Sequence, residues 1–146
     1  MYASYPLAVH VFLVRGDEVL LLRRANTGWE DGKLSVPAGH VERGETATAA
    51  MLRETLEEVG LALDAERLEP VGAMHRRSGD ERVDLLFRYA LAPGEPAPRN
   101  TEPAKCSELL WAKLAALPRD TVPYVSLALA NLARGRWFDE HGWDER

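Results

Sequence analysis

The sequence predicts an α/β fold in which helices pack on the faces of a mixed β-sheet. Apolar runs of strand length occur before and after a stretch without proline or glycine, 46–59, and a second apolar helical stretch follows them. Strands, a helix, more strands and a last helix are typical of this architecture. The chain has 146 residues, of which 46% are hydrophobic, enough for one core and short for two. We therefore expect a single domain over residues 1–146.

The N-terminal part predicts a β-hairpin and a loop. Leu7–Val14 and Val19–Leu22 are separated by Arg15-Gly16-Asp17-Glu18, which favours a turn between two strands. A polar loop, 25–33, comes next. Leu34–Val36 and a turn around Gly39 lead to the first helix.

That helix is expected from Thr46 to Val59, where helix formers dominate and Gly60 provides a C-terminal stop. At about 100° per residue, its apolar residues cluster on one side. We expect this side to face the core: Ala49, Leu52, Leu56 and Val59.

The C-terminal half predicts a return to strands and a final helix. Several prolines make residues 93–103 a loop, and Gly135 closes the last helix. The expected elements are strands Leu68–Arg76, Arg82–Ala92 and Leu109–Ala112 and the helix Tyr124–Ala133. The tail with Trp137, Phe138 and Trp143 either closes the monomer or forms a homodimer face, and the sequence leaves both open.

Composition and charge narrow the range of functions. The net charge of −5 argues against broad electrostatic binding of nucleic acid. The longest apolar run, Leu7–Val14, is too short to cross a membrane, and no basic residue precedes it as in a secretory signal. The lone Cys106 excludes an internal disulfide and is expected to be a packed thiol. We expect a cytoplasmic protein without nucleic-acid or membrane partners.

Three carboxylates stand opposite the apolar side of the first helix. Glu54, Glu57 and Glu58 have the i, i+3, i+4 spacing that makes helical side chains neighbours and like charges repel. One interpretation is a solvated acidic face with Arg53 as a local counter-charge. The other is a site for a divalent cation such as Mg²⁺, which prefers oxygen ligands. Helical geometry alone does not separate the two.

The residues around this helix form a longer pattern. From Gly39 to Leu61 the chain fits G-x5-E-x7-R-E-U-x-E-E-x-G-U, where U is a bulky apolar residue. It meets every fixed position: Gly39, Glu45, Arg53, Glu54, Glu57, Glu58 and Gly60. The pattern resembles the Nudix box, which favours the metal-site interpretation and implies the family's α/β/α sandwich over the whole chain. The first apolar position is instead Thr55, which is expected at the edge of the core stripe.

The resemblance implies roles for these residues. Glu54, Glu57 and Glu58 are expected to bind Mg²⁺ or Mn²⁺. Alternatively, one of the three acts instead as the base toward the attacking water. Arg53 is expected to orient a neighbouring glutamate through a charge-assisted bond. Glu45 is either its partner or an acceptor at the helix start.

Four further residues complete the predicted site. Gly39 is expected where a backbone carbonyl approaches the metal closely. Arg24 is either a phosphate clamp or a surface arginine. Trp29 either stacks on a base or anchors its loop. Glu102, in a segment that resembles certain nucleoside-triphosphate diphosphatases, is either a further metal ligand or plain surface charge.

The resemblance implies hydrolysis of a nucleoside diphosphate linked to another group. The ADP-ribose marker, a proline, is absent around His75-Arg76-Arg77, and Ser78-Gly79 stands where dinucleoside polyphosphate hydrolases often have tyrosine. We therefore favour a MutT-like enzyme that converts a (d)NTP, oxidised nucleotides included, to NMP and pyrophosphate. The alternatives are a hydrolase of ADP-ribose or a nucleotide sugar, and a non-catalytic nucleotide-sensing module.

Overall fold

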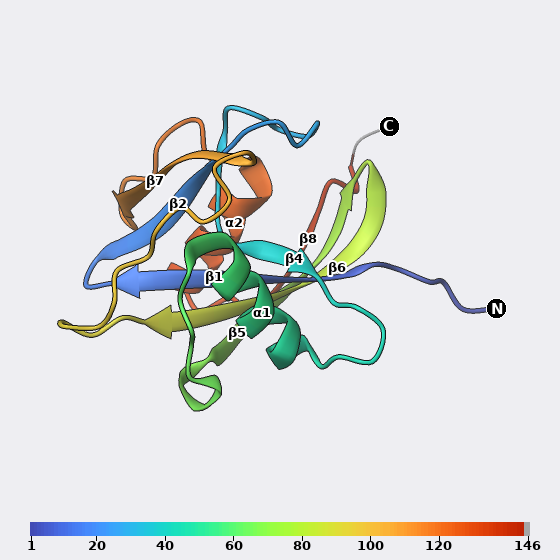
Figure 1. The fold of residues 1–146 in the computed structure, drawn as a ribbon. Helices are drawn as coiled ribbons and strands as arrows, with labels where there is room; N and C mark the ends of the chain where they lie inside the picture. Colours follow the sequence, from blue (N-terminus) through green and yellow to red (C-terminus); the bar gives the residue numbers. More distant parts are fainter. Residues whose placement is uncertain (145–146) are drawn as a thin grey trace.

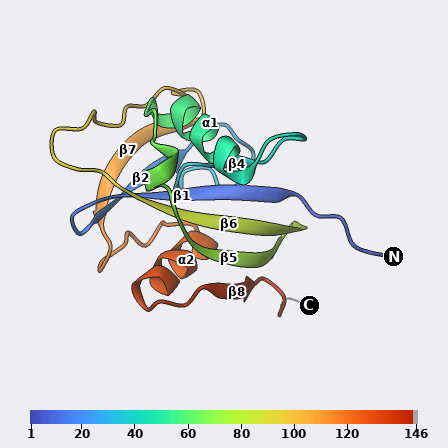
Figure 2. The same ribbon diagram turned by 90° about the horizontal axis from the view of Figure 1, so that it is seen from below.

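A computed structural model describes residues 1–144 of the chain. A mixed sheet forms the central layer, with the helix α1 (Ala47–Val59) on one face and α2 (Pro123–Ala133) on the other. Figure 1 shows the fold, and Figure 2 shows the sheet between the two helices. The predicted α/β/α sandwich is confirmed.

The sheet is built around two long neighbouring strands. β1 runs parallel to β6, and each forms an antiparallel hairpin, β1 with β2 and β6 with β5. The order is β3-β2-β1-β6-β5-β8, with β4 paired to β1 and β7 to β2. The strands are β1 (Leu7–Arg15), β2 (Glu18–Arg24), β3 (Leu34–Ser35), β4 (Ala38–His40), β5 (Glu69–Ser78), β6 (Asp80–Ala90), β7 (Cys106–Lys113) and β8 (Phe138–His141). The predicted hairpin, later strands and last helix are all present.

The structure corrects one prediction and adds one strand. Gly39 lies in the short strand β4 and pairs with Val9 of β1, not in a turn. β8 (Phe138–His141) runs parallel to the edge strand β5. It was not predicted because a four-residue segment with two acidic residues carries no recognisable alternation; backbone pairing at the sheet edge defines it.

The predicted buried face of α1 is correct at Val59 and wrong at the other three positions, since Ala49 and Leu56 are exposed and Leu52 is only partly buried. Leu56 is 53% exposed, whereas Thr55, expected at the edge of the stripe, is completely buried. The buried residues of the helix are Ala50, Met51, Thr55 and Val59. The Thr55 hydroxyl donates to the Met51 carbonyl at 2.7 Å, so burial leaves it satisfied. The helix is therefore rotated about its axis relative to the prediction, and the face that carries Glu54 and Glu58 is turned toward the protein.

Alternate residues of β1 fill two cores, as the two-residue period of a strand requires. Val9, Val11 and Leu13 pack on the α1 side, and Phe12 and Val14 pack on the α2 side. The sheet is therefore covered on both faces, and its edges carry the loops that approach the site.

Two smaller expectations also have outcomes. Cys106 is buried as a free thiol, as expected. In the tail, the Trp143 indole donates to the His75 carbonyl at 2.9 Å, so this end of the chain packs on β5; Trp137 is 56% and Phe138 49% exposed. In residues 1–144, none of α1, α2 and the short 3-10 helix Ala65–Arg67 has the length and apolar character needed to cross a membrane.

Substitutions on α1 distinguish the observed face from the predicted one. We expect Met51→Ala to lower the free energy of unfolding by about 2–5 kcal/mol, because it empties a buried site. Leu56→Gln should change it by less than about 0.5 kcal/mol, because that side chain lies at the surface. Urea unfolding of both variants measures this. Equal losses would show that the helix presents Leu56 to the core.

Candidate active site

The two ends of α1 fix the direction in which its acidic side chains project. At the start, the Thr46 hydroxyl accepts from the Ala49 amide at 3.1 Å, a side-chain cap of the first turn. At the end, Gly60 has a φ of 70° and its amide donates to Leu56, which is the left-handed termination that favours glycine. The helix is held at both ends beside β4.

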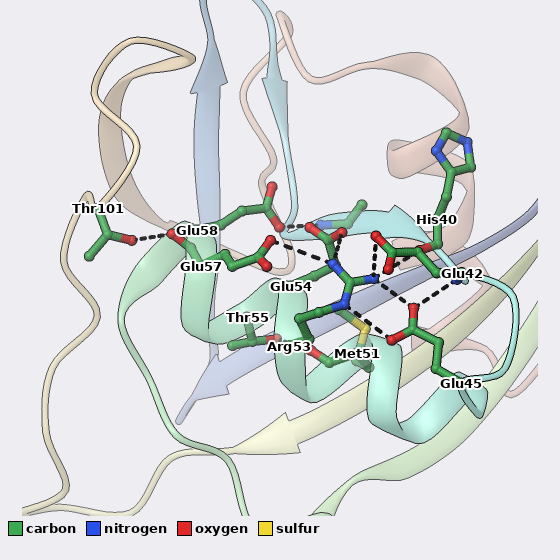
Figure 3. Close-up of polar contacts among 11 residues, drawn as sticks. His40, Glu42, Glu45, Met51, Arg53, Glu54, Thr55, Glu57, Glu58 and Thr101 are labelled. Atoms are coloured by element: carbon green, nitrogen blue, oxygen red, sulfur yellow. Dashed lines mark hydrogen bonds and ion pairs between the residues drawn. The ribbon is translucent and has the colours of Figure 1, made fainter.

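Arg53 is the centre of the polar contacts on this helix (Figure 3). Its guanidinium donates to both oxygens of Glu45, at 2.7 and 3.1 Å, and to Glu54 at 2.8 Å. It also donates to the His40 carbonyl at 3.2 Å and lies 3.5 Å from Glu57. The bond from Arg53 lowers the pKa of Glu45. Arg53 therefore ties α1 to the loop that precedes it.

Glu54 and Glu58 form a partly buried pair of carboxylates. Burial raises the pKa of Glu58 well above its usual range, and the charge of Glu54 raises it further. Burial also raises the pKa of Glu54, against the lowering effect of Arg53. The Ala38 amide donates to Glu58 at 3.0 Å. The Ala38 amide and Arg53 compensate the two carboxylates only in part. A bound cation would stabilise their charged forms.

Gly39 is required at its position by close approach. A Cβ atom there would lie 2.1 Å from the Glu54 carboxyl carbon, well inside van der Waals contact. The backbone of β4 therefore packs directly on the Glu54 carboxylate. Any side chain at residue 39 would displace that carboxylate or the strand.

The proline-containing loop brings Glu102 to the same place. The Thr101 hydroxyl donates to the Glu57 carbonyl at 2.6 Å, and the Arg99 amide donates to the Val59 carbonyl at 2.9 Å. Glu102 consequently lines a cavity of about 530 Å³ together with Arg24 and the three helix glutamates. Its charge adds to the field that raises the pKa of Glu54 and Glu58.

These carboxylates are gathered but not arranged around one point. Across residues 1–144, no three acidic, histidine or cysteine side chains stand in positions that enclose a metal ion. Arg53 donates to one oxygen of Glu54 in this arrangement. The donor chemistry is nevertheless that of a hard divalent cation, because every side-chain donor is a carboxylate.

A second cavity of about 370 Å³ adjoins the first across β4. Both cavities are lined by Arg24, Ala38, Gly39 and His40. Trp29, 38% exposed, lines the second. Arg24 donates to the Trp29 carbonyl at 2.8 Å, and its guanidinium lies 4.9 Å from the centre of that indole ring. Arg24 therefore stands at the boundary between the cavities.

Buried polar residues at the second cavity were missed by sequence reasoning. His10 is 2% exposed and its Nε2 lies 2.9 Å from the Tyr124 hydroxyl. Arg76 and Asp84, also buried, form an ion pair. For His10 a signal did exist, because it interrupts the continuous apolar run of β1. For Asp84 none did, because Arg82 and Arg88 share its side of β6 and mark that side as polar.

Residues 4–131 match the sequence profile of the NUDIX domain. The chain belongs to the Nudix family. The Nudix box from Gly39 to Leu61 lies within the matched range.

Individual relatives of this Nudix protein carry different names. It is 34% identical over 117 residues to the NAD-capped RNA hydrolase NudC of Pseudomonas aeruginosa, covering 80% of this chain and 39% of that protein. It is 28% identical over 118 residues to the 8-oxo-dGTP diphosphatase of Escherichia coli, covering 80% of this chain and 86% of that protein. The chain thus spans well under half of the length of NudC, but most of the length of the second relative.

A solved structure supports the same fold. The MutT NUDIX hydrolase from Burkholderia pseudomallei superposes with a TM-score of 0.78 at 25% identity, over 88% of this chain and 98% of that one. The family and the fold are therefore established, whereas the substrate differs among relatives.

The burial of His10 predicts a specific pH dependence of stability. Burial lowers the pKa of His10 from 6.5 to about 4, so the folded state favours the neutral ring. This contribution is complete above pH 6.5 and is lost as the pH falls toward 4. We expect the loss of this contribution to lower the free energy of unfolding by about 2 kcal/mol between pH 7 and pH 5.

Urea unfolding of the parent and of His10→Gln at both pH values isolates this contribution, because the other titrating groups are common to the two proteins. The parent should lose more stability than the variant on acidification. An identical pH dependence in the two proteins would contradict a neutral, buried His10.

Proposed function

We propose that this Nudix protein hydrolyses nucleoside triphosphates to a monophosphate and pyrophosphate, with oxidised dNTPs among its candidate substrates. The observation that carries the proposal is the excess of partly buried carboxylates, Glu54, Glu58 and Glu102, beside a cavity that Arg24 also lines. The match with a protein named as an 8-oxo-dGTP diphosphatase, over 80% of this chain and 86% of that protein, supports the substrate class. We further propose that residues 1–146 act as one domain.

The proposed metal ligands are Glu54, Glu57, Glu58 and Glu102, with the backbone carbonyl of Gly39. Their carboxylates suit Mg²⁺ or Mn²⁺, and the burial that raises the pKa of Glu54 and Glu58 makes a nearby cation favourable. When bound, such an ion lowers the pKa of a coordinated water and neutralises charge on phosphate oxygens.

The remaining residues position these groups and the substrate. Arg53, held by Glu45, orients Glu54 and lies within ion-pair distance of Glu57. Arg24, which lines both cavities, is proposed to contact a phosphate, and Trp29, which lines the second cavity, is proposed to stack on a base. One of the three helix glutamates is proposed to accept the proton of the attacking water.

A second candidate substrate class is a nucleotide linked to a non-phosphate group. The 34% identity to NudC favours it, because that relative is named for hydrolysis of an NAD cap. A panel of NTPs, dNTPs, 8-oxo-dGTP, ADP-ribose, NAD and nucleotide sugars, assayed with Mg²⁺, separates the two classes. We expect pyrophosphate release from triphosphates to be fastest. Faster turnover of ADP-ribose or NAD than of every triphosphate would overturn the assignment.

The acidic cluster is tested by Glu57→Gln. We expect kcat/KM to fall at least about 100-fold, the upper end of the loss seen when a group supporting a metal ligand is removed, while folding is retained because Glu57 is exposed. Glu66→Gln, at an exposed glutamate outside the cavity, is the matched control. A fully active Glu57→Gln enzyme would remove Glu57 from the metal site.

A further inference from the structure

The second cavity contains a buried ion pair that the proposed hydrolysis does not use. Arg76 on β5 is 3% exposed and Asp84 on β6 is completely buried. Two hydrogen bonds, of 2.6 and 3.0 Å, join them. Burying such a pair costs desolvation that an apolar pair of similar shape avoids. Its presence beside a cavity therefore calls for a reason other than stability.

The guanidinium of Arg76 is held on two sides. Asp84 accepts from Nε and Nη2, and the Tyr124 ring lies under the group, 3.7 Å from its central carbon. Tyr124 is in turn bonded to His10. The third nitrogen, Nη1, donates to no acceptor in residues 1–144, and Arg76 lines the cavity. A rigidly held donor group is therefore available to a ligand.

The charge of this donor is compensated. Asp84 neutralises Arg76, and the neighbouring Arg82 is paired with Asp80 through two bonds of 2.7 Å. A compensated donor favours a neutral acceptor, such as a carbonyl oxygen, over a further phosphate. Arginine donates to the O6 acceptor of guanine in protein–DNA complexes, and Nη1 is the nitrogen of Arg76 that remains for such a contact here.

The cavity also has the volume, lining and position for a base. Trp29 lies 6.1 Å from Tyr124, ring centre to ring centre, so aromatic surface stands beside the Arg76 donor. The volume of about 370 Å³ falls within the range of small-ligand pockets. Arg24 and Gly39 are shared with the carboxylate cavity, so a base placed here has its phosphates next to Glu54 and Glu58.

We propose that Arg76, positioned by Asp84, is a specificity-determining residue that selects purine nucleotides with an oxygen at ring position 6. Hypoxanthine and guanine present an acceptor there to the Arg76 donor. Adenine presents an amino group, which sets donor against donor. The proposal rests on the proposed function in taking a nucleotide as the ligand.

The test compares the binding of IMP and AMP, which differ in the purine only through the oxygen or amino group at position 6 and the proton at the adjacent nitrogen. Titration calorimetry without metal measures the two dissociation constants. We expect IMP to bind about fivefold more tightly or better, the lower end of the discrimination of a two-bond arginine contact to a base, because Nη1 alone is left for the ligand. Since no hydrolysis is needed, this result is independent of whether triphosphates are turned over.

Variants assign the discrimination to the ion pair. In Arg76→Gln combined with Asp84→Asn, which removes both charges together, the ratio should fall to one or below, because glutamine also pairs with adenine. Arg76→Lys should lower the ratio as well, because it keeps the charge and loses the planar fork. Arg67→Gln is the matched control: Arg67 also pairs with a glutamate, Glu95, and stacks on a tyrosine, Tyr89, but lies outside the cavity.

Equal or weaker binding of IMP by the parent protein, or no binding of either nucleotide, would overturn the proposal whether or not the variants fold. An unchanged ratio in a folded double variant would also overturn it and would assign the ion pair a structural role alone.

Discussion

The site depends on acidic side chains that are partly buried against the protein instead of being fully exposed to solvent. Burial raises the pKa of Glu54 and Glu58, the charge of Glu54 raises that of Glu58 further, and the charges of Glu57 and Glu102 raise both. The surrounding structure keeps them in place: β4 offers a backbone without a side chain at Gly39, and Arg53 binds Glu54 while Glu45 binds Arg53. The glycine at residue 39 and the Glu45–Arg53–Glu54 contacts are both explained if these carboxylates have to converge beside a phosphate.

The sheet explains how two cavities share one wall. Strand β4 pairs with β1, which places Gly39 beside Val9 and Ala38 beside His10. The carboxylate cavity lies toward α1, and the cavity with Trp29, Arg76 and Tyr124 adjoins it across that short strand. Arg24, at the end of β2, reaches both. A nucleotide that spans β4 would therefore have its phosphates and its base in chemically different surroundings.

Sequence reasoning reached most of the fold and the acidic cluster, for identifiable reasons. Two apolar runs around a Gly/Asp turn marked the hairpin, and the glycine after Val59 marked the end of α1. Fixed spacing identified Glu54, Glu57 and Glu58. Sequence reasoning gave the wrong orientation of α1, because Leu56 fits an apolar pattern but is exposed. Thr55 is polar but can be buried, because its hydroxyl donates to the Met51 carbonyl. The Arg76–Asp84 pair joins adjacent strands through a register that sequence periodicity does not give.

The central claim is that these carboxylates gather a divalent ion next to a nucleotide. A crystal structure with Mn²⁺ and a non-hydrolysable dNTP analogue tests it most directly, since anomalous scattering locates the ion. The account predicts manganese among Glu54, Glu57 and Glu58, with at least one phosphate oxygen in its coordination sphere. Manganese bound elsewhere, with Glu54 still held by Arg53 and Glu58 by the Ala38 amide, would contradict it.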